Sequence, residues 1–183
     1  MRKATRLSKQ SILLTHHGRL EEAKKSLGET DKLFATLIQL AKKHPDLFYS
    51  GLVDAAFQEY AEARVLLSLV EGKQLVGPEA LNVPSIDYVL GLADVIGELR
   101  RRALDMLRKD NVKTAEKCLE MMEQIYSELM AMDDAYMLVP GLRRKCDVAR
   151  HVIEATRGDV TIEARRASLE RSIKKLEKRI TKK

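Results

Sequence analysis

The chain has 183 residues, enough for one domain with a single hydrophobic core. A third of the residues are charged, there is no Trp, and only four Pro and nine Gly interrupt the sequence, which indicates an all-α protein. There is no run of about 18 apolar residues, which argues against a membrane-spanning helix, and no apolar signal-peptide core follows the N-terminus.

Apolar spacing and turn residues predict seven helices, over about residues 2–27, 31–43, 46–71, 86–109, 112–133, 140–158 and 161–183. The breaks are assigned to Gly28, to Pro45, to a loop over about residues 73–84, and to Gly158. We expect residues 1–160 to form one helical domain and residues 161–183 to add a basic C-terminal helix to it.

The net charge of +6 is concentrated in that last helix, because residues 161–183 hold nine Lys or Arg and three Glu. The rest of the chain is neutral. The last helix also carries a narrow apolar seam, formed by Ile162, Leu169, Ile173, Leu176 and Ile180. A seam of this kind is typical of packing on one other helix, either in the same bundle or in a partner subunit.

The third predicted helix places carboxylates where apolar residues are expected. On a helical wheel, Glu59 falls in the middle of a stripe about 100° wide that begins at Leu52, and Glu62 falls at its edge. An unpaired carboxylate that faces a protein interior costs several kcal/mol or shifts its pKa. We therefore expect Glu59 and Glu62 to face a positive partner.

The fourth predicted helix holds a second acidic pair. Asp94 and Glu98 are four residues apart and lie on one face, which taken alone is more simply explained as the polar face of an amphipathic helix. Gly91 and Gly97 stand inside this helix, where Gly costs about 1 kcal/mol relative to Ala. Such a glycine often marks the close approach of a ligand or another helix.

If the two helices pack antiparallel, these four carboxylates can converge, and like charges in one pocket call for a cation. Oxygen ligands favour Mg²⁺ or Mn²⁺. Iron and zinc fit less well, because no His stands three residues after a Glu and neither Cys118 nor Cys146 has a ligand pair. We read these cysteines as reduced and structural, in a cytoplasmic protein.

A carboxylate-bound Mg²⁺ with basic residues nearby indicates phosphate chemistry, and no P-loop or Ser-His-Asp arrangement is present. Arg2, Arg6 and Lys9 share one face of the first helix, as phosphate contacts or as a solvated face. Arg100, Arg101 and Arg102 follow Glu98 directly, and they either bind phosphates or pair with acids. Both alternatives stay open.

The sequence resembles the translin family, and specifically its translin-associated factor X (Trax) branch in a prokaryotic, archaeal form. The resemblance rests on residues 57–63 (Phe-Gln-Glu-Tyr-Ala-Glu-Ala), on residues 87–101 and on residues 143–148, and it extends to about Asp159. The second stretch is long and specific. The short loop before Pro84 and the basic C-terminal helix depart from the Trax pattern.

The resemblance implies a seven-helix fold that assembles into a closed homo-octamer and binds single-stranded RNA, with single-stranded DNA left open. Translin itself serves binding and assembly, whereas Trax cleaves RNA with Mg²⁺. The Trax acids correspond to Glu59, Glu62, Asp94 and Glu98, which are assigned as catalytic and metal-binding. The residues assigned to nucleic-acid binding are Arg2, Arg6, Lys9, Arg100, Arg101, Arg102, Arg143, Arg144 and Lys145.

The leading hypothesis is a Mg²⁺-dependent endoribonuclease. Direct attack by water would leave a 3′-hydroxyl and a 5′-phosphate. The first alternative is a non-catalytic translin-like assembly that binds RNA or single-stranded DNA. The second is an all-α nucleotide pyrophosphatase, although those enzymes have adjacent glutamates where Gln58 precedes Glu59 here.

Overall fold

The computed structural model describes residues 1–47, 50–132, 136 and 138–181. Within these residues there are seven α-helices and no strand, which confirms the all-α prediction. They are α1 (Arg2–His16), α2 (Leu20–Ala41), α3 (Gly51–Val70), α4 (Pro78–Leu81), α5 (Ser85–Leu107), α6 (Val112–Met130) and α8 (Leu142–Ile180), with a 3₁₀ turn at Pro45–Leu47. None of these helices is long and apolar enough to cross a membrane.

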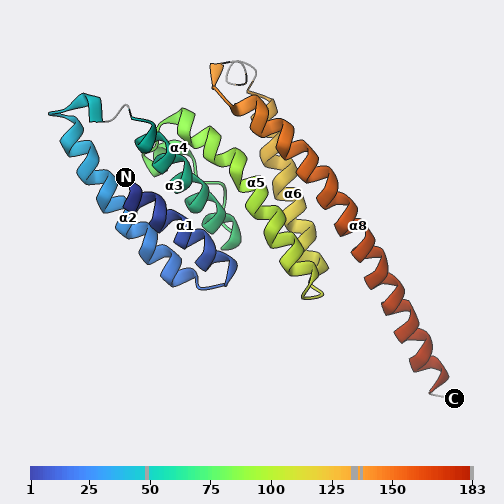
Figure 1. Cartoon of the computed structure of the whole chain (residues 1–183). Coiled ribbons are helices and arrows are strands. Elements are labelled where there is room, and N and C mark those ends of the chain that lie inside the picture. Colours follow the sequence, from blue (N-terminus) through green and yellow to red (C-terminus); the bar gives the residue numbers. More distant parts are fainter. Residues whose placement is uncertain (48–49, 133–135, 137, 182–183) are drawn as a thin grey trace.

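Helix α5 lies at the centre of the bundle, with α3 on one side and the pair α6 and α8 on the other (Figure 1). Helices α1 and α2 pack on each other and cover the outer side of α3. All the long helices contribute to the core, in which Leu66 of α3, Leu99 of α5 and Met122 of α6 are fully buried. The central position of α5 brings its residues within reach of α1, α3 and α8.

The predicted break at Gly28 is wrong. Helix α1 ends at His16, and the turn after it contains Gly18, whose φ of +74° favours glycine; α2 runs without interruption through Gly28. The buried positions Ala23, Leu27 and Thr30 continue across that glycine at helical spacing, and the Thr30 hydroxyl donates to the carbonyl of Ser26 inside the helix. Tertiary burial therefore outweighs the cost of one mid-helix glycine.

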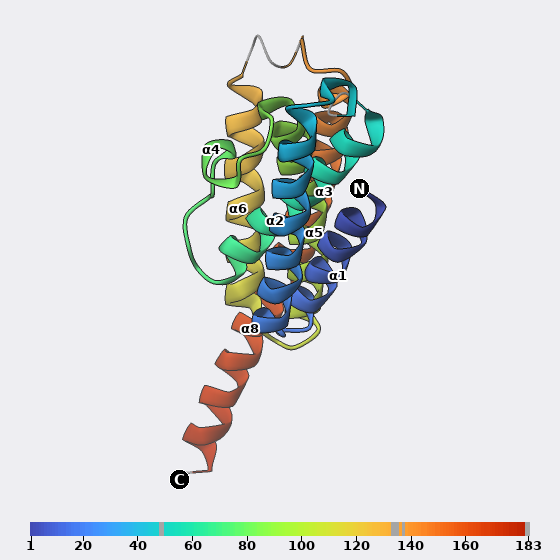
Figure 2. The same ribbon diagram turned by 90° about the vertical axis from the view of Figure 1, so that its left-hand side faces the viewer.

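The predicted break at Gly158 is also wrong. Residues 140–158 and 161–183 were expected to form two helices, but α8 is continuous from Leu142 to Ile180. Thr156 and Val160 are buried on either side of Gly158, so the bundle holds the helix straight through it. Beyond the bundle, α8 projects into solvent (Figure 2).

Candidate functional site

Helices α3 and α5 meet most closely at Gly91. A Cβ added at Gly91 would stand 2.5 Å from the carbonyl oxygen of Gln58 and 3.1 Å from the Cβ of Ala61. The Gln58 amide also donates to Asp87, at 3.2 Å. The prediction that Gly91 marks a close approach of a helix is confirmed.

The two helices run parallel, not antiparallel as the sequence-based hypothesis assumed. Gln58 of α3 lies beside Asp87 and Gly91 of α5. Later along both helices, Asp94 of α5 is the charged group with the largest effect on the pKa of Glu62 of α3. The segment between Val70 and Ser85 returns along the bundle, which permits this direction (Figure 1). The parallel arrangement still brings the two acidic pairs together.

Glu62 is the most deeply buried of the four acids, with 9% of its surface exposed. Burial, followed by the charges of Asp94, Glu59 and Glu98, raises the pKa of Glu62 to about 8, and Lys145 opposes this shift. Within the described part of the chain, its side chain accepts no hydrogen bond and makes no ion pair. The wheel placed Glu59 at the centre and Glu62 at the edge, and the structure reverses that order.

Basic side chains from α1 and α8 pair with the three remaining acids. Lys9 of α1 lies 3.2 Å from Glu59. Lys145 of α8 makes an ion pair with Asp94. The Nε2 atom of His16 lies 2.6 Å from Glu98, and this hydrogen bond is the main reason why the pKa of Glu98 is lowered. Each of these three acids therefore has a basic partner that the chain itself supplies, and Glu62 has none among the described residues.

His16 was not among the site residues predicted from the sequence. Its side chain is only 2% exposed. The available signal was its position, because His16 stands seven residues after Lys9 and so shares its helix face. Both residues of this face reach across to the acids of the neighbouring helices.

The other predicted nucleic-acid-binding residues have different surroundings. Arg2, Arg6, Arg143 and Arg144 are exposed. Arg100 is held by α8, because it donates to Thr156 at 2.8 Å and pairs with Asp159 at 3.3 Å. Arg102 lies against Cys118. Arg101 lies 3.8 Å from Glu98, so it borders the acidic cluster.

A basic cavity of about 710 Å³ adjoins the acidic cluster, between the α1–α2 turn and the end of α5. Its lining includes His16, His17, Arg101, Arg102, Arg108 and Lys109. His16 and Arg101 belong to both features, because each also contacts Glu98. A negatively charged group in this cavity would lie next to Glu98.

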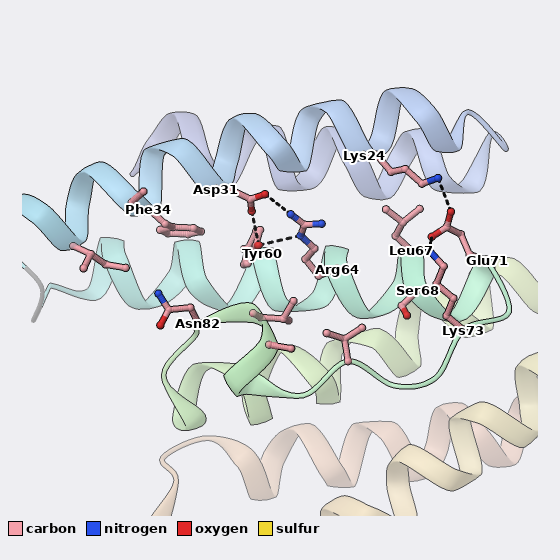
Figure 3. A pocket seen from close by; sticks show the side chains of 15 residues that line it. Lys24, Asp31, Phe34, Tyr60, Arg64, Leu67, Ser68, Glu71, Lys73 and Asn82 are labelled. Atoms are coloured by element: carbon pink, nitrogen blue, oxygen red, sulfur yellow. Dashed lines mark hydrogen bonds and ion pairs between the residues drawn. The ribbon is translucent and has the colours of Figure 1, made fainter.

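A second cavity, of about 560 Å³, lies between α2, α3 and the segment that contains α4 (Figure 3). Asp31 accepts hydrogen bonds from Tyr60 and Arg64 at its edge, and Glu71 pairs with Lys24 and Lys73. Burial is the main reason why the pKa of Tyr60 rises to about 12. The charged side chains of this cavity are paired with one another, and these hydrogen bonds and ion pairs link α2 to α3.

No three His, Cys, Asp or Glu side chains form a ready metal site among the residues that the structure describes. The chemistry of the donor set nevertheless fits a hard cation: three carboxylates lie near enough to Glu62 to raise its pKa, and Glu62 itself is buried without a hydrogen-bond partner among the described residues. These features define an all-α bundle with an inward-facing acidic cluster.

The chain belongs to the translin family, whose family model matches residues 1–180 and so extends past Asp159, where the resemblance was expected to end. It is 33% identical over 158 residues to an uncharacterized protein of Methanocaldococcus jannaschii, covering 86% of this chain and 69% of that protein. The structure of the AfC3PO–duplex RNA complex has a TM-score of 0.80 and 36% identity, with 89% of this chain and 84% of that chain covered. Apo-NeC3PO has a TM-score of 0.77 and 26% identity, with 87% and 83% covered.

Proposed function

We propose that the chain is a Mg²⁺-dependent endoribonuclease that acts on single-stranded RNA within a closed oligomer. The observation that carries this proposal is Glu62, a buried carboxylate whose pKa is raised by burial and by three nearby carboxylates, and which has no hydrogen bond or ion pair in the described chain. Strongly perturbed carboxylates of this kind occur more often at functional sites than elsewhere. Membership of the translin family supports the choice of RNA.

Glu59, Glu62, Asp94 and Glu98 would hold the metal ion, either Mg²⁺ or Mn²⁺. The ion would supply the positive charge that lowers the pKa of the attacking water and stabilises charge on the phosphate in the transition state. Lys9 and Lys145 would then have to turn away from Glu59 and Asp94. Lys9 is 64% exposed, and Lys145 is 30% exposed, so both side chains have room to do so.

The basic residues beside the acids suit a phosphate chain. Arg101 is exposed and borders both Glu98 and the basic cavity, where it would hold the phosphate that precedes or follows the scissile one. His16, fixed by its hydrogen bond, would keep Glu98 ionised and oriented. These residues would position the substrate and the carboxylates, with no need for the 2′-hydroxyl of the RNA.

RNA as a ligand gains support from AfC3PO, which was solved in complex with duplex RNA. That complex concerns duplex RNA, whereas our proposal concerns single strands, so both forms belong in the test. An oligomer is proposed from the same likeness, and the octamer is our specific expectation for it.

The alternative is an assembly that binds RNA or single-stranded DNA without cutting it. One observation favours it: Lys9, His16 and Lys145 already pair with three of the four acids. In this alternative the acidic cluster would be an internal ion-pair network. Added Mg²⁺ would then have no effect on the protein.

The decisive experiment measures cleavage of end-labelled single-stranded RNA, duplex RNA and single-stranded DNA, with Mg²⁺ or with a chelator. We expect Mg²⁺-dependent cleavage of the single-stranded RNA, a 3′-hydroxyl product, and loss of at least about 100-fold in rate in Glu62→Gln. Glu120→Gln is the matched control, because Glu120 is an exposed carboxylate of α6, far from the cluster. Cleavage by Glu62→Gln at the parent rate, or a cyclic 2′,3′-phosphate product, would contradict the proposal.

A further inference from the structure

The part of α8 that leaves the bundle carries apolar side chains in solvent. Ile162, Leu169, Ile173, Leu176 and Ile180 are between 46% and 74% exposed. Figures 1 and 2 show this segment extending past the end of the other helices, so no described element covers it. We define residues 162–180 as the C-terminal arm. A contiguous exposed apolar seam on a soluble helix indicates an interaction surface.

The seam does not continue the face by which α8 packs on its own bundle. Cys146, Ala149, Ile153, Thr156 and Val160 are buried and form one stripe along the helix. At about 100° per residue, the seam of the arm is centred about 200° from that stripe. It therefore points away from the chain's own helices. A partner for the seam has to come from outside this subunit.

The seam follows a heptad repeat. With Ile162, Leu169 and Leu176 at position d, Ile173 and Ile180 fall at position a. Isoleucine at a and leucine at d is the combination that favours two-stranded, parallel coiled coils. Arg166 takes the remaining a position, where a polar residue fixes the register of the two strands.

The charges beside the seam favour a parallel pair of helices over an antiparallel one. All three glutamates of the arm, Glu163, Glu170 and Glu177, fall at position e, and Arg165 and Arg179 fall at position g. In a parallel pair, position g of one helix faces position e of the next heptad on the other helix, which opposes Arg165 to Glu170 of the partner subunit. In an antiparallel pair, e faces e and g faces g, which opposes like charges.

We propose that the C-terminal arm pairs with the arm of a second copy of this chain as a parallel, two-stranded coiled coil. Three heptads are too short to be stable alone, but the arm continues a helix whose first half is anchored in the bundle, so the cost of helix nucleation is already met. The remaining basic residues, Arg171, Lys174, Lys175 and Lys178, fall at positions b, c and f on the outer face of the pair.

Disulfide cross-linking of the full-length chain tests both the pairing and its direction. The native thiols of Cys118 and Cys146 are buried, so a thiol introduced in the arm is the accessible one. In a parallel pair, Leu176→Cys faces its own copy across position d. Under mild oxidation we expect it to form a covalent dimer at least about tenfold faster than Lys175→Cys, which lies on the outer face, because pairing raises the local thiol concentration.

Two further variants test whether the cross-link depends on the apolar seam itself. Leu169→Asp added to Leu176→Cys should abolish the cross-link, whereas Ser168→Asp, one residue away on the outer face, should leave it unchanged. Equal cross-linking of Leu176→Cys and Lys175→Cys would overturn the proposal. So would a cross-link between an Arg166→Cys chain and a Leu176→Cys chain that outpaces either self-pair, because that result indicates antiparallel strands.

A charge exchange provides an independent check. Glu170→Arg should slow the cross-linking of Leu176→Cys, and the added change Arg165→Glu should restore it, since the opposed charges are then exchanged. If the single change affects only RNA binding and leaves the cross-link unchanged, the arm serves nucleic acid and the coiled coil is excluded. None of these readouts depends on nuclease activity, so the arm and the catalytic proposal can fail separately.

Discussion

At the scale of single residues, Glu62 differs most from what a stable fold would select. A carboxylate with a pKa near 8 is largely protonated at neutral pH, and ionising it inside the bundle opposes folding. The sequence pointed to Glu59 as the central acid. The difference arises because the wheel assumed that one stripe is buried, whereas α3 is covered by α1, α2 and α5 together and is buried around most of its circumference.

The pH dependence of stability follows from this shift. The pKa of Glu62 is raised from 4.5 to about 8, so between these values the folded state binds more protons than the unfolded state. The metal-free protein should therefore lose up to a few kcal/mol of stability from this group as the pH rises through that range. Urea unfolding in a chelator at about pH 5 and at about pH 8 measures the loss.

Glu62→Gln should remove most of this dependence and gain stability relative to the parent at the higher pH. Glu120→Gln should keep the parent's dependence. Mg²⁺ should stabilise the parent but have less effect on Glu62→Gln, because the variant lacks one anionic ligand. Identical curves for the parent and Glu62→Gln would show that the buried carboxylate is not the source of the dependence.

His16 and His17 form a matched pair for a second prediction. The His16 side chain is 2% exposed and bonded to Glu98, whereas His17 is exposed. His16→Ala should destabilise the protein by about 1 to 3 kcal/mol, because it leaves the carboxylate without its partner. His17→Ala should change stability by less than about 0.5 kcal/mol. Equal effects of the two substitutions in chemical unfolding would contradict the role assigned to His16.

At the scale of elements, the two glycines of α5 have opposite surroundings. Gly91 has the backbone of α3 against it, whereas a Cβ at Gly97 would meet nothing within 4 Å. Gly91→Ala should therefore cost about 1 to 3 kcal/mol through forced separation of the helices. Gly97→Ala should stabilise by about 0.5 to 1 kcal/mol, because a helix interior favours Ala. Thermal unfolding of both variants checks the contrast, and a stabilising Gly91→Ala would refute it.

The sequence identified the helical class and most of the long helices, because apolar spacing survives in any packing. It misplaced the breaks at Gly28 and Gly158, since a glycine alone cannot show whether neighbouring helices hold it in place. The four acids that it grouped do lie near one another, but it assumed the wrong helix direction. Direction depends on the path of residues 71–84, which carries no strong pattern of its own.

At the scale of the whole molecule, charge is separated into an acidic cluster, a basic cavity beside it and a basic arm. If RNA binds along the basic cavity, Lys109→Ala should weaken binding and lower the slope of log K against log salt by about one unit. Lys117→Ala should leave the slope unchanged, because Lys117 is exposed on α6 outside that cavity. A salt titration of RNA binding by fluorescence anisotropy distinguishes them. Equal slopes would remove the cavity from the binding surface.

The ion pairs at the acidic cluster determine how a metal ion could bind there. Because Lys9, His16 and Lys145 pair with three of the acids, those carboxylates already have partners when the chain folds, before any metal ion binds. A metal ion that binds afterwards would have to displace the ammonium group of Lys9 or of Lys145 from its carboxylate. A competitor that belongs to the chain cannot be diluted away, so it would raise the apparent dissociation constant of the ion by the same factor at every protein concentration.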